Sequence, residues 1–186
     1  MKPNYDIHPF NNKLKIDICI SDVLTEQADA CIVPAHPKRA STSGISKVLL
    51  NTPAKNAILA YQKEAEQKRV PYGSVRITPC SGNNYKYLIH ISTLGLTHHT
   101  ASVETLYFGI RIALKQAEKE GITSIVIPAI NTGKTQMLSY NEAALSTLKA
   151  IFDIKHQLKR LTNIKIVLKN SEAYEIYKET LLLFSN

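Results

Sequence analysis

Short apolar segments of strand character alternate along the chain with longer segments of helical periodicity. In residues 13–20 (KLKIDICI), isoleucine and leucine recur at every second position, which is the pattern of a strand with one buried face. Further β-branched, apolar segments occupy residues 30–35, 74–79, 86–92, 123–128 and 163–168. The last two are nearly continuous in apolar character, as central strands of parallel sheets are.

Helical segments lie between these strands. Thr52 followed by Pro53 is typical of a helix start, and Ser139 with Glu142 has the spacing of a capping box. Gly121 follows a stretch of helical spacing and predicts its end. We therefore expect helices over residues 52–68, 103–120, from 139 onward, and 171–183.

The alternation predicts an α/β fold with a largely parallel sheet and helices on both faces. Neither an internal repeat nor a low-complexity linker interrupts the 186 residues. We expect a single domain over residues 1–186, in which residues 1–12 form a peripheral N-terminal segment.

Composition excludes several classes of protein. Hydrophobic residues make up 44% and charged residues 20%, which excludes a disordered, collagen-like or coiled-coil chain. Apolar runs are far shorter than the roughly 20 residues of a membrane span, and the first ten residues lack a signal-peptide core. We expect a soluble, intracellular and cytoplasmic protein with no membrane partner.

The cysteines and histidines indicate neither a disulfide framework nor a metal site. There are three cysteines, Cys19, Cys31 and Cys80, and no pair has zinc-ligand spacing. His98 and His99 lack a third ligand at metal spacing. We expect free thiols, no metal and no cofactor.

The net charge of +8 favours anionic partners, such as nucleotides or nucleic acid. One stretch, residues 155–169, holds basic residues without an acidic one, among them Lys159, Arg160 and Lys165. Such a stretch is either a solvated face or a docking surface for polyanions.

Ligands of α/β sheets bind beyond the carboxyl ends of the strands, so three junctions are of interest. Asp22 follows the first strand and either caps a turn or accepts hydrogen bonds from a ligand. Small residues lead to Gly44 after the second strand, and Lys38 adds charge there. Gly133 lies in the loop after residue 128, without P-loop spacing. Each loop alone is also compatible with an ordinary turn, but together they predict a site for a nucleoside diphosphate.

The order of these residues resembles the macro domain family, whose members bind ADP-ribose. Ser21-Asp22-Val23 is similar to the family's adenine-reading element, and residues 28–33 (ADACIV) to its next strand. Residues 122–133 (ITSIVIPAINTG) resemble its second phosphate loop. The resemblance covers most of the chain, from about residue 13 onward.

The resemblance implies a three-layer α/β/α sandwich around a mixed, largely parallel sheet, with ADP-ribose across one edge. Asp22 would accept a hydrogen bond from the adenine amine, assisted by the Val23 backbone. Backbone N–H groups of two loops would hold the diphosphate, and no metal is needed. The ligand-binding residues so implied are Asp22, Val23, Pro34, Ala35, Ser43, Gly44, Ile45, Ser46, Asn131, Thr132, Gly133, Lys134 and Asn170.

The chain also departs from the family pattern. The asparagine that orients the distal ribose in hydrolytic members falls at Pro37, and the aspartate that assists the catalytic water falls at Ser46. The aromatic residue near the adenine falls at about Asn170. These departures favour a protein that binds ADP-ribose, a related nucleotide or an ADP-ribosylated target without the usual hydrolase pair.

Two alternatives stay open. One is an ADP-ribosyl hydrolase or O-acetyl-ADP-ribose deacetylase with a non-standard loop, for which His36 and Lys38 are the candidate catalytic residues. The other is a basic module that binds RNA or poly(ADP-ribose). His90 lies within a strand, where we expect a hydrogen-bonded core histidine.

Overall fold

The computed structural model describes residues 4–7, 14–36, 44–68, 70–71, 73–81, 84–93, 101–132 and 137–185, with backbone alone for residues 4–7. The strands are β1 (Asn4–Ile7), β2 (Lys15–Ile20), β3 (Ala28–Ala35), β4 (Val75–Pro79), β5 (Tyr85–Ser92), β6 (Ser124–Pro128) and β7 (Asn163–Leu168). The helices are α1 (Gly44–Leu49), α2 (Lys55–Gln67), α3 (Val103–Glu120), α4 (Tyr140–Ile154) and α5 (Ser171–Ser185), with a short 3-10 turn at Lys155–Gln157.

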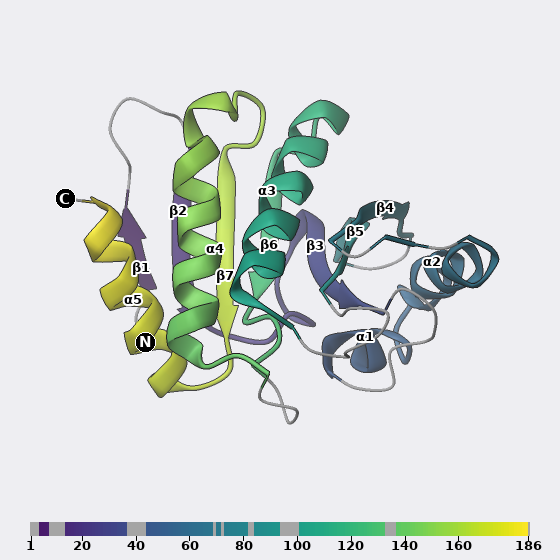
Figure 1. Ribbon diagram of the computed structural model, residues 1–186, viewed down its shortest axis with the longest axis horizontal. Helices are drawn as coiled ribbons and strands as arrows, with labels where there is room; N and C mark the ends of the chain where they lie inside the picture. The colour runs from purple at the N-terminus through teal and green to yellow at the C-terminus, as the bar shows by residue number, and fades with distance from the viewer. Residues whose placement is uncertain are drawn as a thin grey trace.

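Within the described residues, the strands form one seven-stranded sheet in the order β1-β2-β7-β6-β3-β5-β4. The five inner strands run parallel to one another, and only the edge strands β1 and β4 are antiparallel to their neighbours. The predicted mixed, largely parallel sheet is therefore confirmed (Figure 1).

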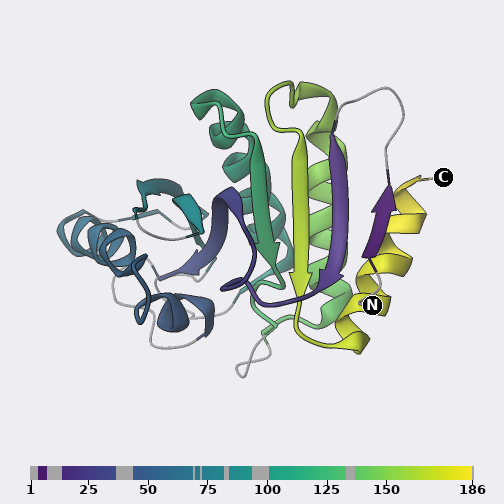
Figure 2. The same ribbon diagram turned by 180° about the vertical axis from the view of Figure 1, so that it is seen from behind.

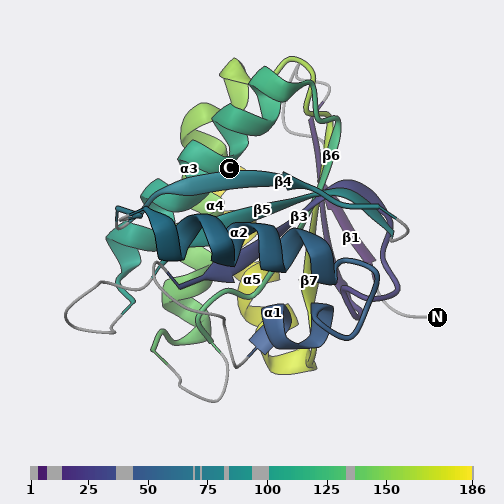
Figure 3. The same cartoon turned by 90° about the vertical axis from the view of Figure 1, so that its right-hand side faces the viewer.

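Helices cover the sheet from two sides and complete a three-layer arrangement. Helices α3, α4 and α5 lie over one face, and α1 and α2 lie against β3, β4 and β5 from the other (Figures 1 and 3). Alternate residues of β3 divide between the two cores, because Ile32 faces α3 and α4 whereas Cys31 and Val33 face α1 and α2.

The ends of two helices follow the predicted signals. Ser139 and Glu142 cap each other reciprocally at the start of α4, and Gly121 ends α3 in the left-handed conformation with φ of 75°. The start of α2 differs from the prediction, because the helix begins at Lys55 rather than at Thr52. Thr52 instead closes a turn, in which its hydroxyl oxygen accepts from the Ala54 N–H at 3.2 Å.

Strand β1 was not expected from the sequence. Residues 1–12 were predicted to be a peripheral segment, and residues 4–7 within it pair with β2 at the edge of the sheet. Four residues are too few to show a hydrophobic period, so only the pairing defines this strand. Among the described residues, no helix has both the length and the apolar character needed to cross a membrane.

Candidate functional site

The carboxyl ends of the five parallel strands lie at one edge of the sheet, which we call the crest (Figure 2). The residues that follow these strands are Ser21, His36, Thr93, Ala129 and Lys169. The three junctions singled out in the sequence therefore lie at the same edge, as expected from parallel strands.

Asp22 is held at the crest by a tight turn after β2. Its Oδ1 accepts from the Leu24 N–H at 2.9 Å, and its carbonyl oxygen accepts from the Thr25 N–H at 2.9 Å. Its Oδ2 lies 4.0 Å from Lys169 Nζ, and 47% of the side chain is exposed. Both interpretations of Asp22 are compatible with this geometry, because one oxygen caps the turn while the other lies beside Lys169 on a half-exposed side chain.

Val23 is fixed from a distant part of the chain. The buried Tyr85 hydroxyl donates to the Val23 carbonyl oxygen, and Asn84 Nδ2 donates to the Leu24 carbonyl oxygen at 2.7 Å. Burial raises the pKa of Tyr85, so its phenol keeps the proton that it donates. The backbone beside Asp22 is thus fixed by two donors at the start of β5.

At the end of β3, side chains of α1 and α2 bind one carbonyl group of the strand and one of the residue that follows it. Ser46 Oγ donates to the Pro34 carbonyl oxygen at 2.8 Å, and the Tyr61 hydroxyl donates to the His36 carbonyl oxygen at 3.3 Å. Ser46 and His36 are 3% and 8% exposed. The Ser46 hydroxyl is therefore turned toward the strand, and its side chain is not presented to the crest.

The first ligand loop is described only from Gly44 onward. Gly44 has φ of 63°, and a Cβ there would meet no atom within 4 Å. Ile45 packs against the core between α1 and the sheet, and Ala35 is buried. The predicted contact Ser43, the candidate Lys38, and Pro37 lie outside the described residues.

The second ligand loop contains a strained residue. Asn131 has φ of 64°, in the left-handed region that favours glycine. Its Oδ1 accepts from the Thr93 hydroxyl at 3.1 Å, and its buried Nδ2 has no hydrogen-bond partner within the part of the chain that the structure describes. Such strain is typical of functional loops. Gly133 and Lys134 lie outside the described residues.

A family model of the macro domain matches residues 34–145. The chain belongs to the macro domain family. It is similar along 98% of its length to the solved macrodomain of Oceanobacillus iheyensis with ADP, with a TM-score of 0.84, 21% identity and 97% of that chain covered. It also resembles the Trypanosoma brucei macrodomain in complex with ADP-ribose, with a TM-score of 0.73 and 18% identity over 88% of this chain and 68% of that one.

Relatives from archaea are closer in sequence than these structures. An uncharacterized protein of Pyrobaculum aerophilum is 29% identical over 162 residues, which cover 85% of this chain and 86% of the relative. One from Sulfurisphaera tokodaii is 28% identical over 166 residues, which cover 87% of this chain and 88% of the relative. The similarity to both relatives extends over nearly the whole macro domain.

Asn170 and Tyr140 form a pair at the crest of this macro domain. Asn170 Oδ1 accepts from the Ala173 N–H at 2.8 Å and so caps α5, while its Nδ2 donates to the Tyr140 hydroxyl at 3.0 Å. Tyr140 was not among the site residues predicted from the sequence. The sequence feature that could have identified it is its position directly after the capping serine, at the helix end that faces the crest.

His90 is a core histidine, as expected from its place within a strand. Its Nε2 lies 2.7 Å from the Thr78 hydroxyl oxygen, and its ring stacks on Tyr61 with centroids 4.5 Å apart. Burial lowers the pKa of His90 to about 3, so the ring is neutral at physiological pH.

The basic stretch 155–169 does not form one continuous charged surface. Lys165 Nζ binds Glu26 Oε2 at 2.7 Å in the middle of β7, so its charge is neutralised. The backbone N–H of Arg160 donates to Glu118 at 2.9 Å at the opposite end of the strand from Lys169. Lys165 therefore does not contribute a free charge to a polyanion-binding surface in this stretch. Within the described ranges, no three His, Cys, Asp or Glu side chains gather in a way that could hold a metal.

Proposed function

We infer that this macro domain binds ADP-ribose, free or attached to a macromolecule, across the crest. The observation that carries this proposal is the arrangement at Asp22. One carboxylate oxygen is fixed by the Leu24 N–H, and the other belongs to a half-exposed side chain and lies 4.0 Å from Lys169 Nζ. A carboxylate so oriented is an acceptor for an exocyclic amine such as that of adenine.

Three further features of the crest support a nucleotide rather than another ligand. The Val23 backbone is fixed beside Asp22, Asn131 is held in the left-handed conformation after β6, and Gly44 begins α1 after β3. In the proposed complex, Asp22 accepts a hydrogen bond from the adenine amine. The loops around Gly44 and Asn131 bind the diphosphate through backbone N–H groups.

The solved relatives support the same ligand. The macrodomains of Oceanobacillus iheyensis and Trypanosoma brucei, which share this fold, have been solved with ADP and with ADP-ribose respectively. Because their sequence identity to this chain is low, they support the fold directly and the ligand only by analogy.

We favour binding over hydrolysis because of Ser46. A residue that assists a catalytic water must present a polar group to the ligand, whereas the Ser46 hydroxyl is buried and donates to Pro34. Pro37 also has no side-chain donor or acceptor. The protein would therefore recognise ADP-ribose or an ADP-ribosylated target without turning it over.

The test is a comparison of two variants by calorimetric titration with ADP-ribose. Asp22→Ala removes the charged acceptor, and we expect affinity to fall about tenfold to a hundredfold, the range for a hydrogen bond to a charged group. Glu66→Ala removes an exposed carboxylate on α2 and serves as the matched control. Equal affinity for both variants would contradict the assignment of Asp22.

A further inference from the structure

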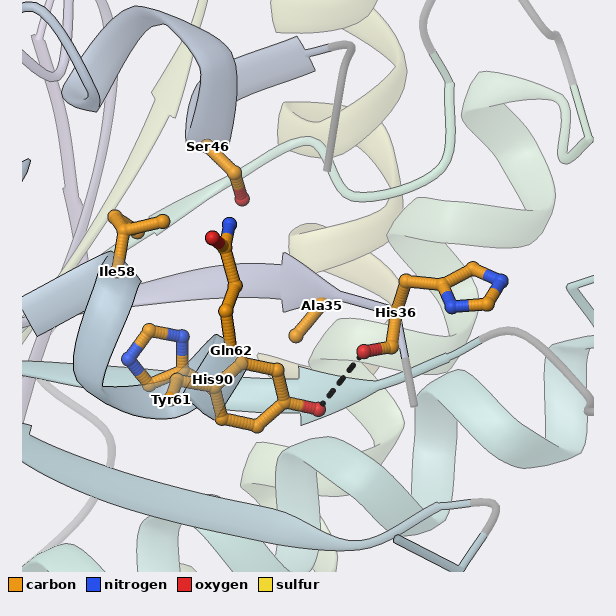
Figure 4. Close-up of a pocket in the computed structure, with 7 residues that line it drawn as sticks. All are labelled: Ala35, His36, Ser46, Ile58, Tyr61, Gln62 and His90. Atoms are coloured by element: carbon orange, nitrogen blue, oxygen red, sulfur yellow. Dashed lines mark hydrogen bonds between the residues drawn. The ribbon is translucent and has the colours of Figure 1, made fainter. Parts of the chain in front are cut away.

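A small polar cavity lies behind the end of β3, between the sheet and helices α1 and α2. Its volume is about 10 Å³. Figure 4 shows the residues that line it and the Gln62 amide extending toward Ser46. The lining residues are Ala35, His36, Ser46, Ile58, Tyr61, Gln62 and His90.

The amide of Gln62 is an unexplained polar group in this cavity. Gln62 is 8% exposed, and its Nε2 is buried with no hydrogen-bond partner among the described residues. An unsatisfied buried donor is strongly destabilising, so native proteins almost always supply a partner. We therefore expect a hydrogen-bond acceptor for Gln62 Nε2 inside the cavity.

The neighbouring hydroxyl groups can accept hydrogen bonds but not donate them into the cavity. Ser46 uses its proton on the Pro34 carbonyl oxygen at 2.8 Å, and Tyr61 uses its proton on the His36 carbonyl oxygen at 3.3 Å. Burial raises the pKa of Tyr61 to about 12, so its hydroxyl stays protonated. A molecule between them must accept from Gln62 and donate to a hydroxyl oxygen.

The size and charge of the cavity restrict the occupant to one small neutral molecule. A volume of about 10 Å³ corresponds to one water-sized sphere. Besides its two histidines and the protonated Tyr61, the lining has no side chain that could balance an ion, and His90 is neutral at physiological pH because burial lowers its pKa to about 3. Water both accepts and donates, and it fits this volume.

We propose that the cavity is a hydration site that holds one water molecule between Gln62 and Ser46. The water accepts from Gln62 Nε2 and donates to Ser46 Oγ, so it links α2 to the first turn of α1. Since Ser46 in turn binds the last residues of β3, the water connects the two helices to the strand end that supports the crest. The proposal rests on the cavity and does not depend on the identity of the ligand.

The test is a crystal structure of the free protein at a resolution that shows ordered water. We expect one density peak within hydrogen-bond distance of both Gln62 Nε2 and Ser46 Oγ. A cavity without such a peak, or direct contact between the Gln62 amide and Ser46 Oγ, would overturn the proposal.

A solution measurement gives a second, independent readout. The side-chain amide protons of Gln62 should exchange magnetisation with a long-lived water in NMR spectra of the native protein. The amide protons of Gln67, which is exposed on the same helix, are the matched control and should contact only short-lived surface water. Absence of the long-lived signal at Gln62, or the same signal at Gln67, would contradict a bound water.

Discussion

Tyr85 donates a hydrogen bond to the carbonyl oxygen of Val23, although 62 residues separate them in the chain. Asn84 repeats this contact one residue further along, at the Leu24 carbonyl oxygen. The segment that carries Asp22 is therefore positioned from the start of β5 as well as by the strand that precedes it.

Replacing Tyr85 with phenylalanine should weaken ADP-ribose binding several-fold. The variant removes one hydroxyl and leaves the Val23 carbonyl oxygen without its donor, so we also expect a loss of about 1–3 kcal/mol in unfolding free energy. Calorimetric titration and urea denaturation measure the two effects separately.

The matched control is Tyr87→Phe, a partly exposed tyrosine on the same strand. We expect that variant to change neither quantity appreciably. If Tyr85→Phe lowered stability and left the ADP-ribose affinity unchanged, Tyr85 would contribute to packing but not to the position of the adenine site.

The buried histidine predicts a pH dependence of stability. Burial lowers the pKa of His90 from its ordinary 6.5 to about 3 in the folded protein, so between these values the unfolded chain binds more protons. Stability is therefore complete above pH 6.5 and falls as the pH drops, by about 1.4 kcal/mol per pH unit from this group. Urea denaturation at pH 7.5 and at pH 5 measures the difference.

The comparison with His90→Gln isolates this contribution, because glutamine does not titrate. Asp29 does not interfere between pH 5 and 7.5. Its burial raises its pKa, but hydrogen bonds from Lys86 and Thr123 outweigh that effect and lower the pKa from 3.8 to about 2, so its contribution to stability is lost only as the pH falls through these two values. An equal pH slope in His90→Gln and in the native protein would show that other groups cause it.

Gly109 of α3 packs directly against Ile91 of β5. A Cβ at this position would lie well inside the contact distance of two carbon atoms from Ile91 Cγ2. Gly109→Ala should therefore lower the unfolding free energy by about 1–3 kcal/mol, although alanine favours helix. The double variant Gly109→Ala/Ile91→Ala should cost less than the sum of the single changes, and additive costs would contradict a direct clash.

Asn131 allows the cost of the left-handed backbone to be measured. Asn131→Gly and Asn131→Ala both lose the bond from Thr93, so their difference reports the conformation alone. We expect the alanine variant to be less stable by about 1–2 kcal/mol in thermal or urea unfolding. Equal stability would mean that the loop relaxes to a negative φ.

Local signals predicted much of the fold. The strand periods, the Ser139–Glu142 capping box and Gly121 each depend on residues close in the chain, and the structure contains all of them. The four-residue strand β1 and the start of α2 at Lys55 depend on pairing and on a turn, which leave no periodic pattern.

The site was less predictable because its contacts are long-range. Asp22 was identified from its place after a strand, but the donors that fix its neighbourhood come from β5. Likewise, nothing near Ser46 in the sequence shows that its hydroxyl turns to Pro34, and nothing near Lys165 identifies Glu26 as its partner. Such contacts arise only when distant elements pack together.

The measurement that tests the central claim most directly is calorimetric titration of the native protein with ADP-ribose, with ADP and AMP as controls. The account predicts saturable one-to-one binding of ADP-ribose in the micromolar range, with weaker binding of AMP. Absence of binding by all three nucleotides at millimolar concentration would contradict a nucleotide site at the crest.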